Sequence, residues 1–397
     1  MHILFLAPHP FYQERGTPIA VNLLLKAFSE KAYVVDVVTY HEGFDVEYNN
    51  VQLYRIPEIP GMHNIRPGFS WKKIICDLLM IFVVLKLMRK RKYNLIHSVE
   101  ESVFFALLFK FFWGIPYVYD MDSSLSQQII DKKPYLKCFS SIFRLCESFA
   151  VRHAIAVVPV CEALYRSIQP YCPRRVVVLH DVSLLEGSEG SRSEELREKI
   201  SIPGLLVMYV GNLESYQGID LLLDSFALAL QKTTPADLVV IGGVPKDIGT
   251  YQKKAHDLTI EHKVHFLGPK PIEHLGGYLA QADIVVSPRL QGENTPMKLY
   301  SYLHSGKALL ATNLSTHTQV LNSRVAMLAD PTPEAFSEAL VALMCDQRLR
   351  SALGQAGKQL IEDCYSYANF RAKIFGLFDT LEQELDGRGN AQTSVAQ

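Results

Sequence analysis

The sequence lacks any paired arrangement of cysteines. Seven cysteines are scattered along 397 residues, and no two of them have the C-x-x-C spacing of a metal or redox site. Dispersed cysteines are typical of reduced thiols in a cytosolic chain. A net charge of -1 likewise gives no electrostatic basis for binding nucleic acid. These absences exclude a disulfide-stabilised scaffold, a cysteine metal site and a nucleic-acid-binding role.

No stretch of the sequence reaches the roughly 20 apolar residues that a membrane-spanning helix needs. The apolar start, MHILFLAPHP, has neither a charged leader nor a long apolar run, which favours a first buried strand over a targeting segment. We therefore expect a cytoplasmic protein.

Residues 71–92 come closest to a membrane segment. Their apolar body is interrupted by Asp77 and Lys86 and is flanked by basic residues at both ends. Two interpretations remain open. The segment is either a buried helix of a layered sheet, or a helix that lies among lipid headgroups and attaches the protein peripherally to the inner face of the membrane.

Both halves of the chain alternate short apolar strands with helical segments. Apolar runs such as LVVI are typical of strands buried on both faces of a parallel sheet. Such alternation predicts a doubly wound sheet in each half. Because 397 residues exceed one compact core, we expect an α/β protein with two Rossmann-like domains that face each other across a central cleft.

A polar, Gly/Ser-rich segment, LLEGSEGSRSEELRE, separates the two alternations. It predicts a first domain over residues 1–184, a linker over 185–200 and a second domain over 201–365. Residues 366–385 are expected to form a closing helix that packs back on the first domain. The tail, 386–397, is expected to be disordered.

The second half contains a compact strand, loop, helix and strand from Ser287 to Asn313, SPRLQGENTPMKLYSYLHSGKALLATN. Thr295 followed by Pro296 predicts a helix start, because Thr caps free N–H groups and Pro at the first helical position loses only an unpaired donor. Gly306 predicts the helix end. The positive end of this helix dipole, beside a polar loop, favours an anion such as phosphate. The alternative is an ordinary unit with a solvated loop.

Other strand ends carry further candidates. Gly211 to Gly218 follow the strand that opens the second domain, where glycine either permits close approach of a ligand or serves the turn. Asp120 to Ser124 follow a predicted strand of the first domain, and open α/β sheets bind ligands at the carboxyl ends of their strands. Gly242–Gly243 lacks the G-x-G-x-x-G spacing, so a dinucleotide site is not predicted.

The order of these motifs resembles a known family. YVGNL, QGIDLLLDSF, LVVIGG, VHFLGP, LAQADIVVSPR and TPMKLYSYLHSGKALLATN look like the C-terminal half of the GT-B glycosyltransferases of family 4. The likeness is strong over Leu205 to Leu328, and RGTPIAVNLLLKAF and PYVYDMDSS resemble the family's acceptor domain more loosely. The resemblance implies a retaining enzyme that uses a nucleotide-sugar donor, with no metal and no cofactor.

Carried over residue by residue, the resemblance places the donor site in the second domain. Glu293 matches the first acid of the family's two-glutamate motif, which contacts the donor sugar, whereas Ser301 replaces the second acid, which holds the ribose. Asn212 and Gln217 replace the arginine and lysine that clamp the diphosphate, and neither can neutralise a phosphate. The other donor-side candidates are Gly211, Arg289, Asn294, Thr295 and Lys298. Arg289, Lys298 and the helix start at Asn294–Thr295 would substitute for that clamp.

In the first domain, Asp122 occupies the place where the family often has a histidine. A carboxylate there either accepts a proton from the acceptor hydroxyl, stabilises positive charge on the sugar, or caps the next helix. Asp122 and Glu293 are therefore the catalytic candidates. Gly16 matches the loop that approaches the donor phosphates. The acceptor-side candidates are Arg15, His97 and Asp120.

Together these residues predict transfer of a sugar from a nucleotide sugar to a glycan or lipid-linked acceptor, in polysaccharide or glycolipid biosynthesis, with retention of configuration. Two alternatives belong to other classes. One is a nucleotide-sugar epimerase of the same fold. The other is a non-catalytic partner that keeps the fold, which the replacements at Asn212, Gln217 and Ser301 motivate.

Overall fold

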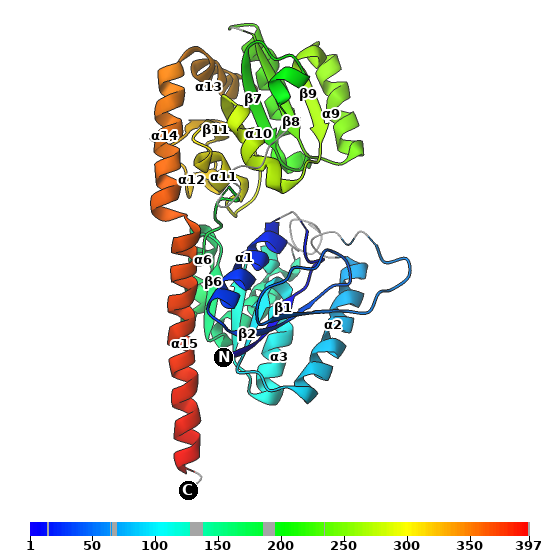
Figure 1. Cartoon of the computed structure of the whole chain (residues 1–397), viewed down its shortest axis with the longest axis vertical. Coiled ribbons are helices and arrows are strands. Elements are labelled where there is room, and N and C mark those ends of the chain that lie inside the picture. The colour runs from blue at the N-terminus through cyan, green and yellow to red at the C-terminus, as the bar shows by residue number, and fades with distance from the viewer. Residues whose placement is uncertain are drawn as a thin grey trace. The chain divides into compact units, whose positions relative to one another are not determined.

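The computed structural model describes residues 1–13, 16–63, 65, 70–127, 138–185, 195–233 and 235–395, with the backbone alone for 388–395. Contacts divide the chain into two units (Figure 1). Unit 1 comprises Met1–His180 and Phe370–Gln397, and unit 2 comprises Asp181–Asn369. Each unit is built on one six-stranded sheet. The predicted fold class, α/β with two doubly wound Rossmann-like sheets, is confirmed.

The sheet of unit 1 is parallel throughout, with the strand order β3-β2-β1-β4-β5-β6. Every residue of β4 and β5 is buried, as expected for central strands covered on both faces. The strands are β1 (His2–Ala7), β2 (Val34–Thr39), β3 (Val51–Arg55), β4 (Leu95–Val99), β5 (Tyr117–Met121) and β6 (Ala156–Pro159).

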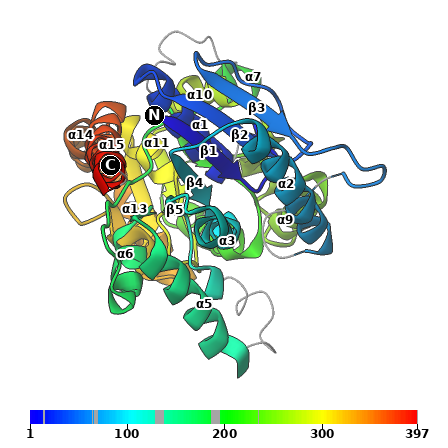
Figure 2. The same ribbon diagram turned by 90° about the horizontal axis from the view of Figure 1, so that it is seen from below.

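Helices cover both faces of this sheet (Figure 2). On one face, α2, α3, α5 and α6 share a core with Leu4 and Leu6 of β1. On the other face, Phe5 of β1 contacts Phe28 of α1, with 6.2 Å between ring centroids. The helical elements are α1 (Gly16–Glu30), α2 (Trp71–Lys90), η1 (Glu100–Ser102), α3 (Val103–Trp113), α5 (Ser140–His153), α6 (Glu162–Ile168) and η3 (Gln169–Tyr171).

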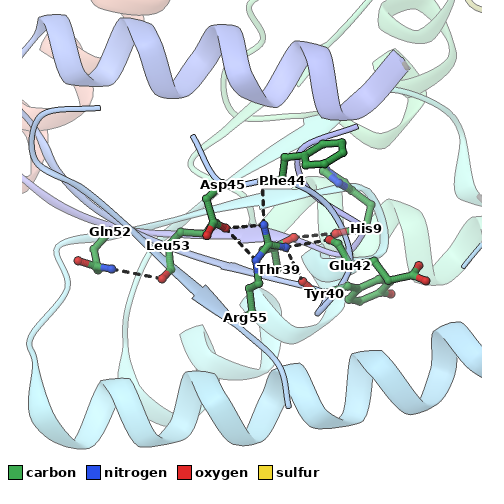
Figure 3. A network of polar contacts seen from close by, with 9 residues as sticks. All are labelled: His9, Thr39, Tyr40, Glu42, Phe44, Asp45, Gln52, Leu53 and Arg55. Carbon is green, nitrogen blue, oxygen red and sulfur yellow. Dashed lines mark hydrogen bonds and ion pairs between the residues drawn. The ribbon is translucent and has the colours of Figure 1, made fainter. Parts of the chain in front are cut away.

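Arg55, the last residue of β3, holds the loop that follows β2 (Figure 3). Its Nη1 donates to the carbonyl oxygens of Tyr40 and Glu42 at 3.2 and 2.8 Å. Its Nη2 donates to the carbonyl oxygen of Phe44 at 2.8 Å and to the carboxylate of Asp45 at 2.7 Å. The guanidinium is therefore committed to the loop, and it fixes the carboxyl edge of the unit 1 sheet.

The last helix, α15 (Tyr367–Val395), belongs to unit 1 from Phe370 onward. Phe378 packs 4.7 Å from the ring of Phe28, and Glu382 accepts a hydrogen bond from the hydroxyl of Tyr33 at 3.1 Å. The helix continues to Val395, whereas the sequence predicts disorder from residue 386. No proline interrupts these residues, so the helical register extends through them.

The sheet of unit 2 is also parallel, with the order β12-β11-β10-β7-β8-β9. Its strands are β7 (Leu205–Val210), β8 (Ala236–Ile241), β9 (Val264–Gly268), β10 (Ile284–Ser287), β11 (Ala308–Thr312) and β12 (Met327–Ala329). Its helical elements are α7 (Leu196–Lys199), η4 (Ser215–Gln217), α8 (Ile219–Leu230), α9 (Pro245–Asp257), η5 (Glu261–Lys263), η6 (Ile272–His274), α10 (Leu275–Gln281), α11 (Lys298–His304), α12 (Ser315–Thr318), α13 (Pro333–Cys345) and α14 (Gln347–Cys364).

Helix α2 covers most of the apolar segment 71–92, which the sequence allows to be either a buried helix or a helix at the membrane surface. Its start is capped, because the hydroxyl of Ser70 accepts a hydrogen bond from the backbone N–H of Lys73 at 3.2 Å. Among the described residues, no helix combines the length and the apolar character needed to cross a bilayer.

Candidate functional site

The unit 2 sheet reverses its winding between β7 and β10, which pair directly. From β7 the chain proceeds outward to β8, and from β10 it proceeds in the opposite direction to β11. The loops that follow β7 and β10, residues 211–218 and 288–297, therefore part at the carboxyl edge of the sheet. Ligands of open α/β sheets bind in the crevice at such a switch point. The donor-side candidates of unit 2 all lie in these two loops or in α11, whereas Gly16 belongs to unit 1.

The two loops touch at Gly218. Its φ is +75°, and an added Cβ atom would lie 2.0 Å from the carbonyl oxygen of Pro288. Beside this contact, the backbone N–H of Leu290 donates to the carbonyl of Tyr216 at 2.8 Å. Glycine is required here both for the left-handed backbone and for the close approach of the two loops.

Gly218→Ala is expected to lower the free energy of unfolding by at least about 2 kcal/mol, because the Cβ atom adds a clash to a strained φ. Gly249→Ala in α9 is the matched control, since nothing lies within 4 Å of the added atom. There, alanine in a helix gains about 0.5–1 kcal/mol. Denaturant unfolding of both variants measures the difference, and equal stability would contradict this assignment.

Helix α11 begins at Lys298, so the prediction of a helix start at Thr295–Pro296 is wrong. The backbone N–H groups of Leu299 and Tyr300 donate to the carbonyls of Pro296 and Met297 at 3.0 and 3.2 Å. These tight i to i+3 bonds satisfy the first turn without a side-chain cap. The hydroxyl of Thr295 is instead buried with no hydrogen-bond partner among the described residues.

Lys298, the first residue of α11, reaches the loop after β7. Its Nζ donates to Oε1 of Gln217 at 3.0 Å and lies 4.0 Å from the ring centroid of Tyr209. An added Cβ at Gly211 would lie 3.2 Å from this Nζ. Burial, and secondarily the charge of Arg289, hold the pKa of the Lys298 amine well below its usual range. An incoming anion would therefore favour protonation of this amine.

Arg289 organises the loop after β10. Its Nε donates to the carbonyl of Gln291 at 2.6 Å, and its Nη2 donates to Oδ1 of Asn294 at 3.0 Å. The guanidinium lies 5.4 Å from the ring centroid of Tyr216. Gly292 permits this arrangement, because an added Cβ would lie 2.0 Å from Nη2 of Arg289. Asn294, another donor-side candidate, is thus a partner of Arg289.

A buried polar network below this loop was not predicted from the sequence. His317 is fully buried, with its Nδ1 2.9 Å from the carbonyl of Thr312 and its Nε2 2.9 Å from the hydroxyl of Ser287. Because a carbonyl only accepts, Nδ1 carries the proton and Nε2 accepts from Ser287. The hydroxyl of Thr312 donates to the carbonyl of Arg289 at 2.6 Å. The network therefore positions the start of the loop.

The exposed catalytic candidate Glu293 sits on the same braced loop. Gln319 donates to its carbonyl at 2.8 Å, and Thr316 donates to the carbonyl of Asn294 at 2.7 Å. Its side chain is exposed. The only sequence signal for these contacts was the cluster of hydroxyl, imidazole and amide residues in STHTQ, after β11. The sequence does not show that these side chains reach β10 and the loop that follows it.

The side chains of two other donor-side candidates accept hydrogen bonds from backbone N–H groups of the protein. Ser301 is 1% exposed, and its hydroxyl accepts the backbone N–H of Leu184 at 3.0 Å. Asn212 is exposed, and its side-chain oxygen accepts from the backbone N–H of Glu214 at 3.3 Å, which shapes the turn.

Unit 1 brings together two of its acceptor-side candidates. His97 on β4 is fully buried, stacks on Phe5 at 4.6 Å, and places its Nε2 3.1 Å from Oδ2 of Asp120 on β5. Asp122, one residue beyond β5, is half-buried, and Gly16 is the first residue of α1. Arg15 lies outside the described residues.

A second unpredicted cluster lies between α2 and the carboxyl edge of the unit 1 sheet. The hydroxyl of Tyr40 donates to Asp77 at 2.5 Å, and Lys73 forms an ion pair with Glu101. Burial raises the pKa of Asp77 to about 6 and that of Glu101 to about 7, against the opposing charge of Lys73. Of the two charged residues that interrupt the apolar sequence of α2, Asp77 is thus turned inward and Lys86 is exposed.

Comparison with known proteins finds a family model that matches unit 2. Residues 192–360 match the family model described as glycosyl transferases group 1. This match covers most of unit 2, so unit 2 is similar to the group 1 glycosyltransferases. The matched residues include every donor-side candidate of unit 2.

Relatives and solved structures agree with this family. The chain is 25% identical over 308 residues to the D-inositol 3-phosphate glycosyltransferase of Corynebacterium glutamicum, an alignment that covers 73% of each chain. The sucrose-phosphate synthase of Thermosynechococcus elongatus superposes with a TM-score of 0.78 at 14% identity, covering 96% of this chain and 99% of that one. Anabaena HepE in complex with UDP-glucose gives 0.72 at 15% identity, covering 96% and 100%. These structural likenesses show the shared GT-B fold, as predicted.

Proposed function

We propose that this glycosyltransferase moves a sugar from a nucleotide sugar, held at the switch point of unit 2, to an acceptor hydroxyl with retention of configuration. The observation that carries the proposal is Lys298. It brings a cation from α11 to Gln217, where the family's phosphate-binding lysine is missing, and beside the backbone of Gly211. The unpartnered hydroxyl of Thr295 lies just ahead of α11 and would gain a partner from a phosphate oxygen.

The remaining roles follow from the resemblance. We assign to Glu293 the contact with the donor sugar, and to Asp122 the proton transfer or charge stabilisation on the acceptor side. Stabilisation of the leaving diphosphate by Lys298 and by backbone N–H groups requires no metal. Because HepE binds UDP-glucose, UDP-sugars are the first donors to test.

The acceptor is proposed to be a glycan or a lipid-linked sugar. The relative that acts on D-inositol 3-phosphate supports a second candidate, a small phosphorylated polyol. Incubation with each acceptor class, followed by NMR of the anomeric proton of the product, distinguishes them and tests retention. Release of an altered free sugar in the absence of acceptor would instead indicate an epimerase.

Donor binding is expected to weaken as pH rises. A bound diphosphate favours the charged form of Lys298, whose pKa is lowered by burial in the free protein. Binding therefore takes up a proton above that lowered pKa, and affinity falls with increasing pH up to the higher pKa of the complex. Calorimetry with UDP, in buffers of different ionisation enthalpy and with EDTA present, measures both the affinity and the proton uptake.

Lys298→Gln is expected to remove the proton uptake and to weaken UDP binding about tenfold or more. Lys307→Gln is the matched control. Burial also lowers the pKa of Lys307, but this residue immediately precedes β11 and so lies at the opposite edge of the sheet. If the two variants had the same UDP affinity and the same proton uptake, Lys298 would not be the phosphate contact. If no nucleotide bound the unmodified protein, the non-catalytic partner would replace the transferase as the better account.

A further inference from the structure

One face of unit 1 exposes an unusual number of large apolar side chains. On α2 they are spaced three or four residues apart, which places them in one stripe along the helix. Each is at least 36% exposed: Trp71, Ile74, Ile75, Leu78 and Phe82. The opposite stripe of the same helix, with Met80 and Val84, is buried in the core of unit 1.

Helices α3 and α5 add a second apolar area. The end of α3 exposes Leu108, Phe111, Phe112 and Trp113. Helix α5 and the residue before it expose Phe139, Ile142, Leu145 and Phe149. The rings of Phe111 and Phe149 stack with their centroids 5.9 Å apart, which joins the two helices into one surface. Helix α2 lies beside α3 in Figures 1 and 2 and packs on the same face of the sheet.

The exposed charges on these three helices are all positive. Lys86, Arg89 and Lys90 are exposed on α2, and Arg144 and Arg152 are exposed on α5. The helices contain only two acids, and both are turned inward. Asp77 accepts from Tyr40, and Glu147 is 3% exposed and accepts from the backbone N–H of Leu125 at 2.9 Å.

Both tryptophans of the chain lie on this face. Trp71 is 63% exposed at the start of α2, and Trp113 is 54% exposed at the end of α3. Indole rings are amphipathic and gather at the headgroup level of membranes. An exposed surface that combines aromatic, aliphatic and cationic side chains without carboxylates matches an anionic lipid surface.

We propose that α2, α3 and α5 together form a docking face for a membrane that contains anionic lipids. The apolar side chains enter the boundary between headgroups and acyl chains, and the cations pair with lipid phosphates. A second copy of this chain would bring like charges together, which disfavours self-association through this face. The proposal concerns binding alone and does not depend on the donor or on the reaction.

The test uses the full chain and vesicles of phosphatidylcholine, with and without phosphatidylglycerol. Tryptophan emission should shift to shorter wavelength, and the protein should co-sediment, only when phosphatidylglycerol is present. Trp71→Phe and Trp113→Phe each leave a single reporter, and the remaining indole should still shift. Replacing Lys86, Arg89 and Lys90 by Gln should weaken binding about fivefold for each charge removed, and added salt should weaken it likewise.

The double variant Phe82→Glu, Phe112→Glu should lose vesicle binding and remain folded by circular dichroism. Phe44→Glu is the matched control, because Phe44 is 74% exposed in unit 1 but lies outside the three helices. Unchanged emission and no sedimentation with anionic vesicles would overturn the proposal, and so would equal losses in both variants. Self-association that Phe82→Glu abolishes, without any vesicle binding, would assign the face to a second copy.

Discussion

Glu293→Ala is expected to reduce kcat/KM for sugar transfer about a hundredfold, because the charged hydrogen-bond partner that we propose for the donor sugar is lost. The fold should be unaffected. The side chain of Glu293 is exposed, and Gln319 and Thr316 hold the loop through its backbone carbonyls. Thermal unfolding should therefore give the same midpoint as the unmodified protein.

The control for Glu293 is Glu273→Ala, which removes an exposed carboxylate from η6 of the same unit. Turnover should be measured with the donor that calorimetry identifies, and binding of the free nucleotide should be measured in parallel. Loss of transfer with retained nucleotide binding would place Glu293 at the sugar. Transfer at the normal rate in Glu293→Ala would show that the donor sugar lies elsewhere.

His317→Leu is expected to lower the free energy of unfolding by about 3 kcal/mol. The leucine fills much of the volume but leaves the hydroxyl of Ser287 and the carbonyl of Thr312 without the imidazole partner they have in the buried network. Denaturant unfolding measures the loss. His262→Leu, at an exposed position in η5, is the control and should change stability by no more than about 0.5 kcal/mol.

The same substitution is expected to change the response to acid. Burial lowers the pKa of His317 to about 4, whereas an unfolded histidine titrates near 6.5. The unfolded chain therefore takes up a proton first, and stability is lost as pH falls from about 6.5 to about 4, by up to about 3 kcal/mol from this group. The free energy of unfolding should depend less steeply on pH in His317→Leu than in the unmodified protein. If the slope were the same in both proteins, His317 would not be neutral in the folded state.

His180 of unit 1 contributes to the same acid range. Its pKa is also lowered to about 4, mainly by burial and then by Lys373. Part of the slope should therefore remain in the His317 variant.

The pair Thr-Pro shows how far local sequence rules extend. Thr332–Pro333 begins α13 as the rule predicts, and the hydroxyl of Thr332 accepts the N–H of Ala335 at 3.3 Å. Thr295–Pro296 has the same sequence but begins no helix, because the loop ahead of it is bound to Arg289, Thr316 and Gln319. A local signal decides the outcome only where no tertiary contact competes with it.

The sequence by itself determined the fold class, the two alternations of strand and helix, and the strand ends that carry the donor-side candidates, because these depend on apolar patterning along the chain. Only the tertiary structure decided how the polar residues are used. Packing turned Asp77 of α2 inward to Tyr40, joined Lys298 to Gln217, and placed His317 beneath the loop of Arg289. Asp77 and Tyr40 are 37 positions apart in the chain, and Lys298 and Gln217 are 81 apart. His317 and Arg289 are 28 positions apart. Contacts of that kind arise from strand order and register, which patterning along a single chain does not encode.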